Sequence, residues 1–314
     1  YRGILDHITA ANADGLMMTG QVAARAVGLI LGLDLSLHPF LTNRVYRDSA
    51  GRPLAERVGA LRDPSFRERL FAEQRAQAAV RERDKLGGSL IHKYELLFEM
   101  ADTPDYEPSL GESIAARAER EQTTPEELAL EVMLAGNGGG MLYLPFLNYV
   151  DGNLDAVHEM LIHPHTVPGL GDGGAHVGTI CDGSFPTTLL QYWGRDRSHD
   201  TIDLEFLVHR HCQGTARTVG LLDRGVIAPG YRADLNIVDF DNLRLHKPEI
   251  AHDLPAGGRR LLQRAGGWAH TIVAGEETYH EGEATEALPG RLVRGAKEAP
   301  GASHPSRRTE VTIL

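Results

Sequence analysis

The spacing of apolar positions along the chain predicts helices and strands in alternation. A period near 3.6 residues is typical of an amphipathic helix, whereas a short uninterrupted apolar run is typical of a buried strand. On this basis helices are predicted at 1–13, 54–62, 64–84, 113–120, 124–134, 153–161 and 202–221. Strand-like runs are predicted at 16–22, 27–38, 141–147 and 166–170. Strands that alternate with helices are typical of a parallel α/β fold.

One helix boundary is marked by several signals at once. Thr124 is placed as the N-cap, Pro125 occupies the first helical position, and Glu127 stands at the reciprocal capping position. The glycine-rich segment 136–140 follows this helix and is expected to terminate it. It is not a phosphate-binding loop, because it lacks the Gly-Lys-Ser/Thr ending and follows a helix rather than a strand.

The pattern changes after residue 225. A Pro-Gly turn at 229–230 precedes a strand that runs to Phe240, and residues 271–280 predict a β-hairpin with its turn near Gly275. We therefore expect an α/β part over 1–225 and a small β module over 226–288. Residues 289–314 are rich in Gly, Pro, Ser and Arg without periodicity, so a mobile tail is expected there.

Composition narrows the class of protein. Of 314 residues, 42% are apolar and 24% are charged, which supports a sizeable core and excludes global disorder. The formal net charge of -11 argues against a general nucleic-acid binder and against attraction to anionic membranes. Two cysteines exclude a disulfide scaffold. With no signal peptide and no transmembrane run in view, a cytoplasmic protein is expected, with its oligomeric state left open.

The most informative segment for chemistry is Val167-Pro-Gly-Leu-Gly-Asp-Gly-Gly-Ala-His-Val177. An acidic residue, Asp172, stands directly at the carboxyl end of an apolar strand and is surrounded by glycines. In a parallel α/β barrel this end of each strand faces the active site. The alternative interpretation is a turn aspartate that bonds its own backbone.

Three segments carry a resemblance to a known family. Leu170-Gly-Asp-Gly-Gly-Ala-His-Val-Gly178, with Phe185-Pro-Thr187 after it, resembles the last barrel strand of the amidohydrolase superfamily, and more narrowly of the N-acyl-D-amino-acid deacylase (D-aminoacylase) family. Residues 214–235 resemble the segment that leaves the barrel and enters a small β-sandwich. Residues 32–40 form the third match.

The resemblance implies a TIM-type (β/α)8 metal-dependent hydrolase barrel, of which this chain holds a C-terminal part, with a small β-sandwich module. The implied activity is hydrolysis of the amide bond of N-acyl-D-amino acids, with zinc as cofactor and a small N-acyl amino acid as the partner molecule. Asp172 matches the catalytic aspartate, and Gly171 departs from the serine usual before it. The segments that supply the metal ligands find no counterpart here. They are expected in a missing N-terminal half, and Tyr1 is expected to lie within a longer protein.

Other side chains are candidates for substrate contact. His176 lies four residues beyond Asp172, and His38 closes an apolar run. Arg195 has the bidentate chemistry that suits a carboxylate. Thr187 is a further candidate, and Gln21 and Tyr192 are less favoured candidates for substrate contact. Each also has an ordinary structural interpretation, as a loop, core or surface residue.

Two His-x-His triplets are set aside as metal ligands. His163-Pro-His165 precedes its strand, so it belongs at the opposite rim from the site. His209 and His211 lie on a predicted helix, where residues two apart point to different faces. Two alternative functions remain open: a cyclic-amide hydrolase of the dihydroorotase or hydantoinase type, and a non-catalytic fragment that lacks the metal site.

Overall fold

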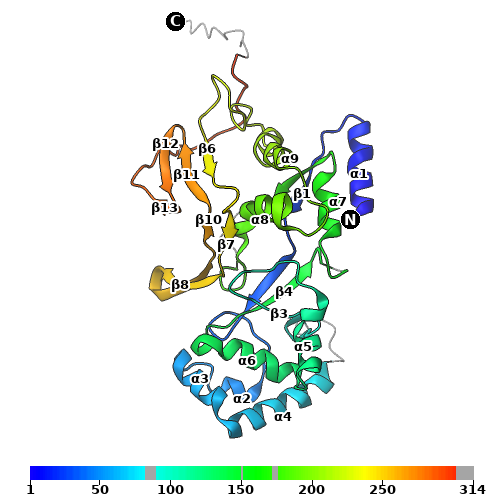
Figure 1. Cartoon of the computed structure of the whole chain (residues 1–314), viewed down its shortest axis with the longest axis vertical. Coiled ribbons are helices and arrows are strands. Elements are labelled where there is room, and N and C mark those ends of the chain that lie inside the picture. Colours follow the sequence, from blue (N-terminus) through cyan, green and yellow to red (C-terminus); the bar gives the residue numbers. More distant parts are fainter. Residues whose placement is uncertain (82–89, 150, 172–175, 302–314) are drawn as a thin grey trace, which may run out of the picture.

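The computed structural model describes residues 1–81, 90–149, 151–171 and 176–301. Three regions are visible in Figure 1: a lobe of helices at the bottom, a central region around β1, and a group of strands at the upper left. The predicted strand at 141–147 connects the helical lobe to the central region.

The central region is built on a pair of parallel strands, β1 (Gly20–Ala23) and β5 (Thr166–Gly169), whose residues Ala23 and Gly169 are opposite each other. Helices pack around this pair. They are α1 (Arg2–Ala13), α7 (Asp155–Ile162), α8 (Phe185–Gln191), α9 (Leu204–His209) and α10 (Thr215–Thr218). Trp193 is fully buried in the core of this region and donates its indole N–H to the carbonyl of Ala24 over 2.6 Å.

The helical lobe lies between β2 and β4 in the sequence. It contains α2 (Arg44–Arg47), α3 (Leu54–Arg62), α4 (Pro64–Arg81), α5 (Ile114–Arg120) and α6 (Pro125–Gly138). The capping box predicted at Thr124 is confirmed, because its hydroxyl accepts from the Glu127 N–H while the Glu127 carboxylate accepts from the Thr124 N–H. The regular helix ends at Ala135, where ψ is 150°, as the glycine-rich segment predicts.

The strands beside the helical lobe correct one expectation. β4 (Leu142–Leu147) pairs antiparallel with both β2 (Val27–Leu31) and β3 (Phe98–Glu99), although strand–helix alternation predicted parallel pairing. The reason is the connection: the chain from β2 to β4 passes through the whole helical lobe, which returns it in the opposite direction. A single crossover helix would have enforced a parallel partner.

The strands at the upper left belong to the C-terminal part of the chain, where the sequence predicts a small β module (Figure 1). A four-stranded sheet has the order β13–β12–β11–β6, with β6 at Leu235–Val238, β11 at Trp268–Val273, β12 at Glu276–His280 and β13 at Glu283–Ala284. The predicted hairpin turn at Gly275 is confirmed, with φ of 86°. Two short pairs accompany the sheet: β7 (Arg244–Leu245) with β10 (Ala265–Gly266), and β8 (Glu249–Leu254) with β9 (Gly258–Leu262).

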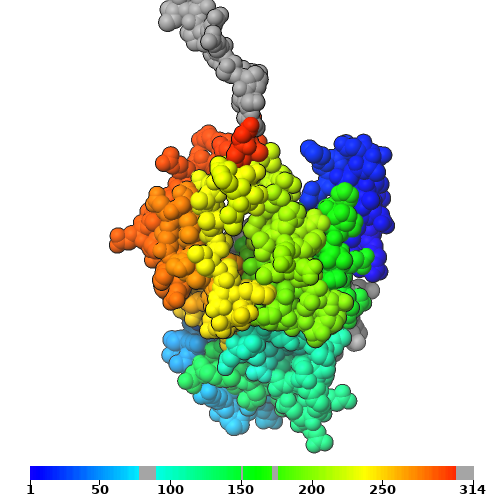
Figure 2. Space-filling view, turned by 45° about the horizontal axis from the view of Figure 1, so that its top comes forward, coloured from blue at the N-terminus to red at the C-terminus, as the bar shows by residue number. Residues whose placement is uncertain are grey.

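The β module lies against the central helices in the space-filling view (Figure 2), and polar contacts join the two. The Trp268 indole N–H donates to Thr187 Oγ1 over 3.1 Å. Part of the C-terminal segment is also attached, because Lys297 forms a parallel bridge with Leu221. In the described part of the chain no closed barrel is found, and no helix there has the length and apolar character needed to cross a membrane.

Candidate functional site

The carboxyl end of β5, after which the sequence predicts the site, lies beside the carboxyl end of β1. Beyond β5 the chain passes through Leu170 and Gly171, and Asp172 comes next but lies outside the described residues. Leu170 has a φ of 62°, a left-handed conformation that a leucine keeps only where the surrounding structure imposes it. The backbone that leads to Asp172 is therefore constrained.

A small cavity of about 30 Å³ lies at this edge, with room for a water molecule. Its wall is largely apolar and comes from the ends of both strands, from the start of α8 and from the turn after α9. The lining residues are Ala24, Pro168, Gly169, Gly171, Phe185, Pro186, Leu189 and His211. Gly171 lies close to the Pro186 ring, since a Cβ at position 171 would be 3.2 Å from Pro186 Cγ.

His211 is the titratable residue among the described lining residues. Its Nδ1 is buried and has no hydrogen-bond partner in the part of the chain that the structure describes. Burial lowers the pKa of His211, which favours the neutral imidazole. His209 diverges from it as expected, with its Nε2 3.0 Å from Gln213 Oε1. The cavity wall thus includes one imidazole ring, and burial favours its neutral form.

Sequence reasoning missed His211 as a cavity residue. It set aside His209 and His211 as a pair because residues two apart on a helix diverge, which is correct. However, α9 continues into a π-helical turn over Arg210–Gly214, and this turn directs His211 toward β5. No local sequence signal distinguishes such a turn from a regular helix.

The structure places His38 away from this cavity. It is 1% exposed, its Nδ1 accepts from the Phe40 N–H over 3.2 Å, and its ring packs edge-on against Tyr46 at 4.6 Å. Burial, with a smaller contribution from the nearby Arg57, lowers the pKa of His38 to about 3. Its observed contacts are those of a core residue of the helical lobe.

Arg195 and Thr187 both contact the β module. Arg195 Nη1 donates to the carbonyls of Phe240 and Asp241, the latter over 2.9 Å, and Nη2 donates to the carbonyl of Leu243 over 2.7 Å. Its Nε donates to the carboxylate of its neighbour Asp196. Thr187 of α8 accepts from the Trp268 indole, and Arg195 lies in the π-helical turn Tyr192–Asp196 that follows α8. Both candidates therefore contribute to the junction between the central helices and the β module.

The remaining candidates are dispersed. His176 is exposed with φ of 51°, and its carbonyl accepts from the Thr179 and Ile180 N–H groups. Tyr192 donates its hydroxyl to Glu107, and Gln21 is exposed on β1 beside Gly169. None of the four substrate-contact candidates, His38, His176, Thr187 and Arg195, lines the described cavity wall. Their roles in substrate binding stay predictions.

A buried arginine near the site had no sequence signal. Arg25 is 3% exposed and lies two residues beyond β1. It donates to Cys181 O over 2.8 Å and to Thr188 Oγ1 over 3.2 Å, and its guanidinium lies 3.7 Å from the centre of the Tyr106 ring. This cation therefore ties the end of β1 to the start of α8, the two elements that flank the cavity.

Two clusters of metal-ligating side chains occur among the described residues, and neither lines this cavity. One is His270, Glu277 and His280 in the β module. The other is Glu107, Asp155 and His199 in the central region. A catalytic zinc site uses three protein ligands and keeps one open position. The described cavity wall offers one imidazole, so it does not by itself form such a site.

Comparison with known proteins gives two kinds of match. The model of the amidohydrolase family matches residues 9–279. Among solved structures, a D-aminoacylase is 20% identical, with a TM-score of 0.36, over 61% of this chain and 36% of its own. An N-acyl-D-glutamate deacylase from Bordetella bronchiseptica, solved with zinc and a phosphonate inhibitor, is 22% identical, with a TM-score of 0.33, over 73% of this chain and 45% of its own.

The matches cover less than half of these longer proteins: this chain spans 36% to 45% of the length of the solved structures named above. A comparison with curated proteins found no match.

Proposed function

We propose an amide-hydrolysing function for this chain, which belongs to the amidohydrolase family. The proposed enzyme depends on a metal ion and cleaves the amide bond of N-acyl-D-amino acids. The observation that carries the proposal is the placement of Gly171, which precedes Asp172 in the sequence, in the wall of a cavity at the carboxyl ends of two parallel strands. In α/β barrels this edge bears the catalytic groups.

The proposed role of Asp172 is proton transfer. The carboxylate takes a proton from the attacking water as the oxygen bonds to the acyl carbon, and it returns that proton to the departing nitrogen as the C–N bond breaks. The products are a carboxylic acid and a free amino acid. Without protonation the amine would be a poor leaving group, so one carboxylate that serves both steps lowers both barriers.

Zinc, the proposed metal, supplies a water of lowered pKa and polarises the scissile carbonyl when bound. Because the described cavity wall offers a single imidazole, we assign no metal ligand there and place the ligands outside the described residues. Within this proposal His211 provides a neutral hydrogen-bonding group to a molecule in the cavity, and the apolar wall restricts water access.

The finer fold is part of the same proposal. We propose that β1 and β5 are two strands of a (β/α)8 barrel and that the β module is the small sandwich that accompanies it, within the division at 1–225, 226–288 and 289–314. The parallel pairing of β1 with β5 supports this proposal, as does the family match across both parts.

A substrate panel tests the proposed function. A protein that holds this chain together with the metal-ligand segments expected from the family resemblance is incubated with zinc and with N-acetyl-D-amino acids (N-acetyl-D-glutamate and N-acetyl-D-methionine), their L enantiomers, and hydantoins. The release of free amino acid or ring-opened product is followed. We expect turnover of the D substrates in preference to the L forms. Ring opening of hydantoins alone, or no turnover of any substrate, would overturn the proposal in favour of the cyclic-amide hydrolase or the non-catalytic fragment.

A further inference from the structure

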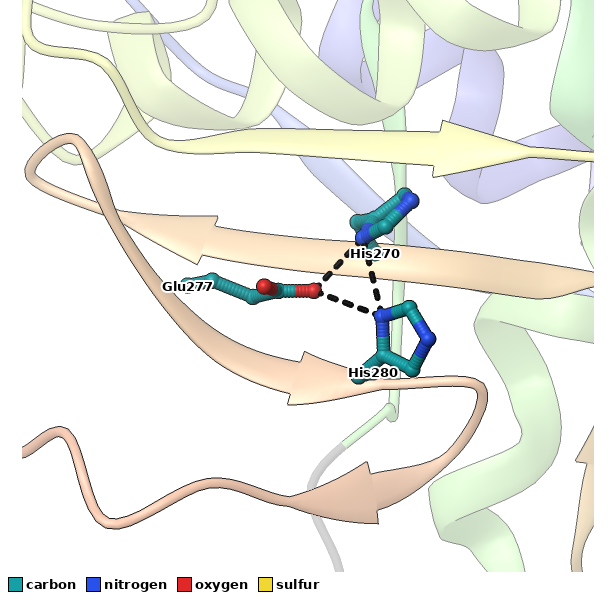
Figure 3. A group of neighbouring side chains, drawn as sticks. All are labelled: His270, Glu277 and His280. Carbon is teal, nitrogen blue, oxygen red and sulfur yellow. Dashed lines mark hydrogen bonds and ion pairs between the residues drawn. The ribbon is translucent and has the colours of Figure 1, made fainter.

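Three potential ligand atoms converge on the surface of the β module. His270 Nδ1 lies 2.5 Å from Glu277 Oε1, His280 Nδ1 lies 3.0 Å from the same oxygen, and the two Nδ1 atoms are 3.3 Å apart. Figure 3 shows the side chains meeting over β11 and β12. All three are partly exposed, with side-chain exposures of 35%, 41% and 58% for His270, Glu277 and His280.

The strand register explains how these residues come to share one face. His270 and His280 are direct cross-strand partners, so their side chains point the same way. Glu277 is three residues before His280, and in a regular strand it would point to the opposite face. The register shifts between Thr271 and Ile272, which leaves Thr278 as an extra residue on β12 and makes Glu277 the partner of Ile272.

The bulge at Thr278 is held by hydrogen bonds. Its hydroxyl donates to the Thr271 carbonyl over 3.1 Å, and its own carbonyl accepts from the Thr285 N–H over 2.9 Å. The Thr285 hydroxyl donates to the Glu277 carbonyl over 2.7 Å. Since an extra residue resets the alternation of a strand, this bulge directs Glu277 to the histidine face.

The separation of the nitrogens matches tetrahedral metal coordination. A Zn–N bond of about 2.05 Å and a tetrahedral angle place two ligand nitrogens about 3.3 Å apart. This is the distance between His270 Nδ1 and His280 Nδ1. The Glu277 oxygen lies closer than this, within hydrogen-bonding range, and its exposed side chain has freedom to move outward around an ion.

We propose that His270, Glu277 and His280 form a divalent-cation site in the β module, separate from the proposed hydrolase site, with Zn²⁺ as its preferred ion. Two imidazoles and one carboxylate are ligands that suit Zn²⁺ better than Mg²⁺ or Ca²⁺, which prefer oxygen. A fourth position is open to water because the site is exposed. A bound ion joins β11 to β12 across the hairpin and stabilises the bulged register.

The second cluster of this kind is already neutralised by an arginine. Glu107 accepts from Arg197 Nε and Nη2, both over 3.0 Å, and Asp155 accepts from Arg197 Nη2 over 2.5 Å. A metal ion between Glu107, Asp155 and His199 would meet this guanidinium, and the like charges would repel. Among the described residues no arginine or lysine forms an ion pair with the cluster in the β module, whose three side chains contact one another.

Zinc titration of the metal-free chain tests the site by stoichiometry. The variants are the double substitution His270→Ala/His280→Ala and the conservative Glu277→Gln. The control is His163→Ala/His165→Ala, a second histidine pair that is partly exposed and has ring centres 5.8 Å apart. Binding is measured by calorimetry, folding by circular dichroism, and stabilisation by the rise in Tm with added Zn²⁺. Because the readout is binding, the result is independent of the proposed hydrolysis.

We expect the wild-type chain and the control to bind one more Zn²⁺ per chain than the double variant does. Glu277→Gln should lower the affinity of the site for Zn²⁺ by at least about tenfold, because loss of even a hydrogen-bond partner outside the ligand set commonly lowers metal affinity that much. Equal stoichiometry in wild type and double variant would overturn the proposal, as would loss of the ion from the control. If the double variant misfolds, unchanged affinity in Glu277→Gln overturns it instead.

Discussion

Arg197 and Glu107 form a bidentate ion pair across 90 residues of sequence, with Nε and Nη2 each 3.0 Å from a separate carboxylate oxygen. The Arg197 side chain is fully buried and that of Glu107 is 8% exposed. Burial pushes the pKa of Glu107 upward, but hydrogen bonds from Arg197, Tyr192 and the Leu154 N–H outweigh it and leave this pKa below its usual range. The pair therefore stays charged and fixes the segment around Glu107 to the central helices.

Removing the Arg197 side chain should strongly destabilise the fold. Arg197→Met leaves the Glu107 carboxylate buried without its cation, and we expect a loss of about 3–5 kcal/mol in the free energy of unfolding. Arg260→Met is the matched control, because Arg260 forms an equally bidentate pair with Asp253 that is exposed. Urea unfolding compares the two, and losses of equal size would contradict this account of the buried pair.

The acid sensitivity of the fold should depend on His38. In the unfolded chain this histidine takes up a proton below pH 6.5, whereas in the folded chain it stays neutral down to about pH 3. The unfolded state thus binds more protons in this window, so stability falls as pH decreases from about 6.5 toward 3, by about 1.4 kcal/mol per pH unit. His38→Asn keeps an acceptor for the Phe40 N–H and removes this contribution. Unfolding free energies between pH 4.5 and 7 should show a shallower slope in the variant, and identical slopes would refute the assignment.

Two adjacent glycines after α6 should respond differently to alanine. A Cβ at Gly140 would lie 1.8 Å from the carbonyl oxygen of Val132, whereas the nearest atom to a Cβ at Gly139 is 3.4 Å away. We expect Gly140→Ala to cost about 1–3 kcal/mol or more, because the backbone must move. Gly139→Ala should stay within about 0.5 kcal/mol of wild type. Thermal unfolding measures both, and equal Tm values would be evidence against this packing.

The junction between the central helices and the β module should depend on Arg195. Arg195→Ala leaves three backbone carbonyls, those of Phe240, Asp241 and Leu243, without their charged donor, and hydrogen bonds of this kind are worth about 1.5–3 kcal/mol before solvent screening reduces the figure. Hydrogen exchange of amides in 235–245 should accelerate while exchange in the helical lobe stays unchanged. Arg294→Ala, at an exposed arginine, is the control. Unchanged exchange at 235–245 would contradict the role in the junction.

Local signals in the sequence were sufficient to predict structure at positions where the residue type itself determines the backbone geometry. The capping box at Thr124 and the turn at Gly275 are both confirmed, because each depends on contacts within a few residues. The direction of β4 was not predictable in this way, since it depends on the path of the helical lobe.

At the candidate site, too, local sequence signals predicted some features and missed others. The strand that ends before Asp172 is found in the structure at 166–169, as its apolar pattern predicts. His211 was missed because a π-helical turn sets its direction. The convergence of His270, Glu277 and His280 was equally hidden, because it requires one extra residue at Thr278 that no alternation pattern reveals.

The amide-hydrolase proposal is tested most directly by the turnover of N-acetyl-D-amino acids, assayed with zinc, in a protein that holds this chain together with the expected metal-ligand segments. The Asp172→Asn variant of that protein is compared with its wild type. Asp14→Asn, at an exposed aspartate after α1, is the control. A carboxylate that moves a proton in both steps should be worth at least about 10²-fold in kcat, so we expect a loss of that size or more in Asp172→Asn with the fold intact and with Asp14→Asn unaffected. Turnover by Asp172→Asn within a fewfold of wild type would contradict the account.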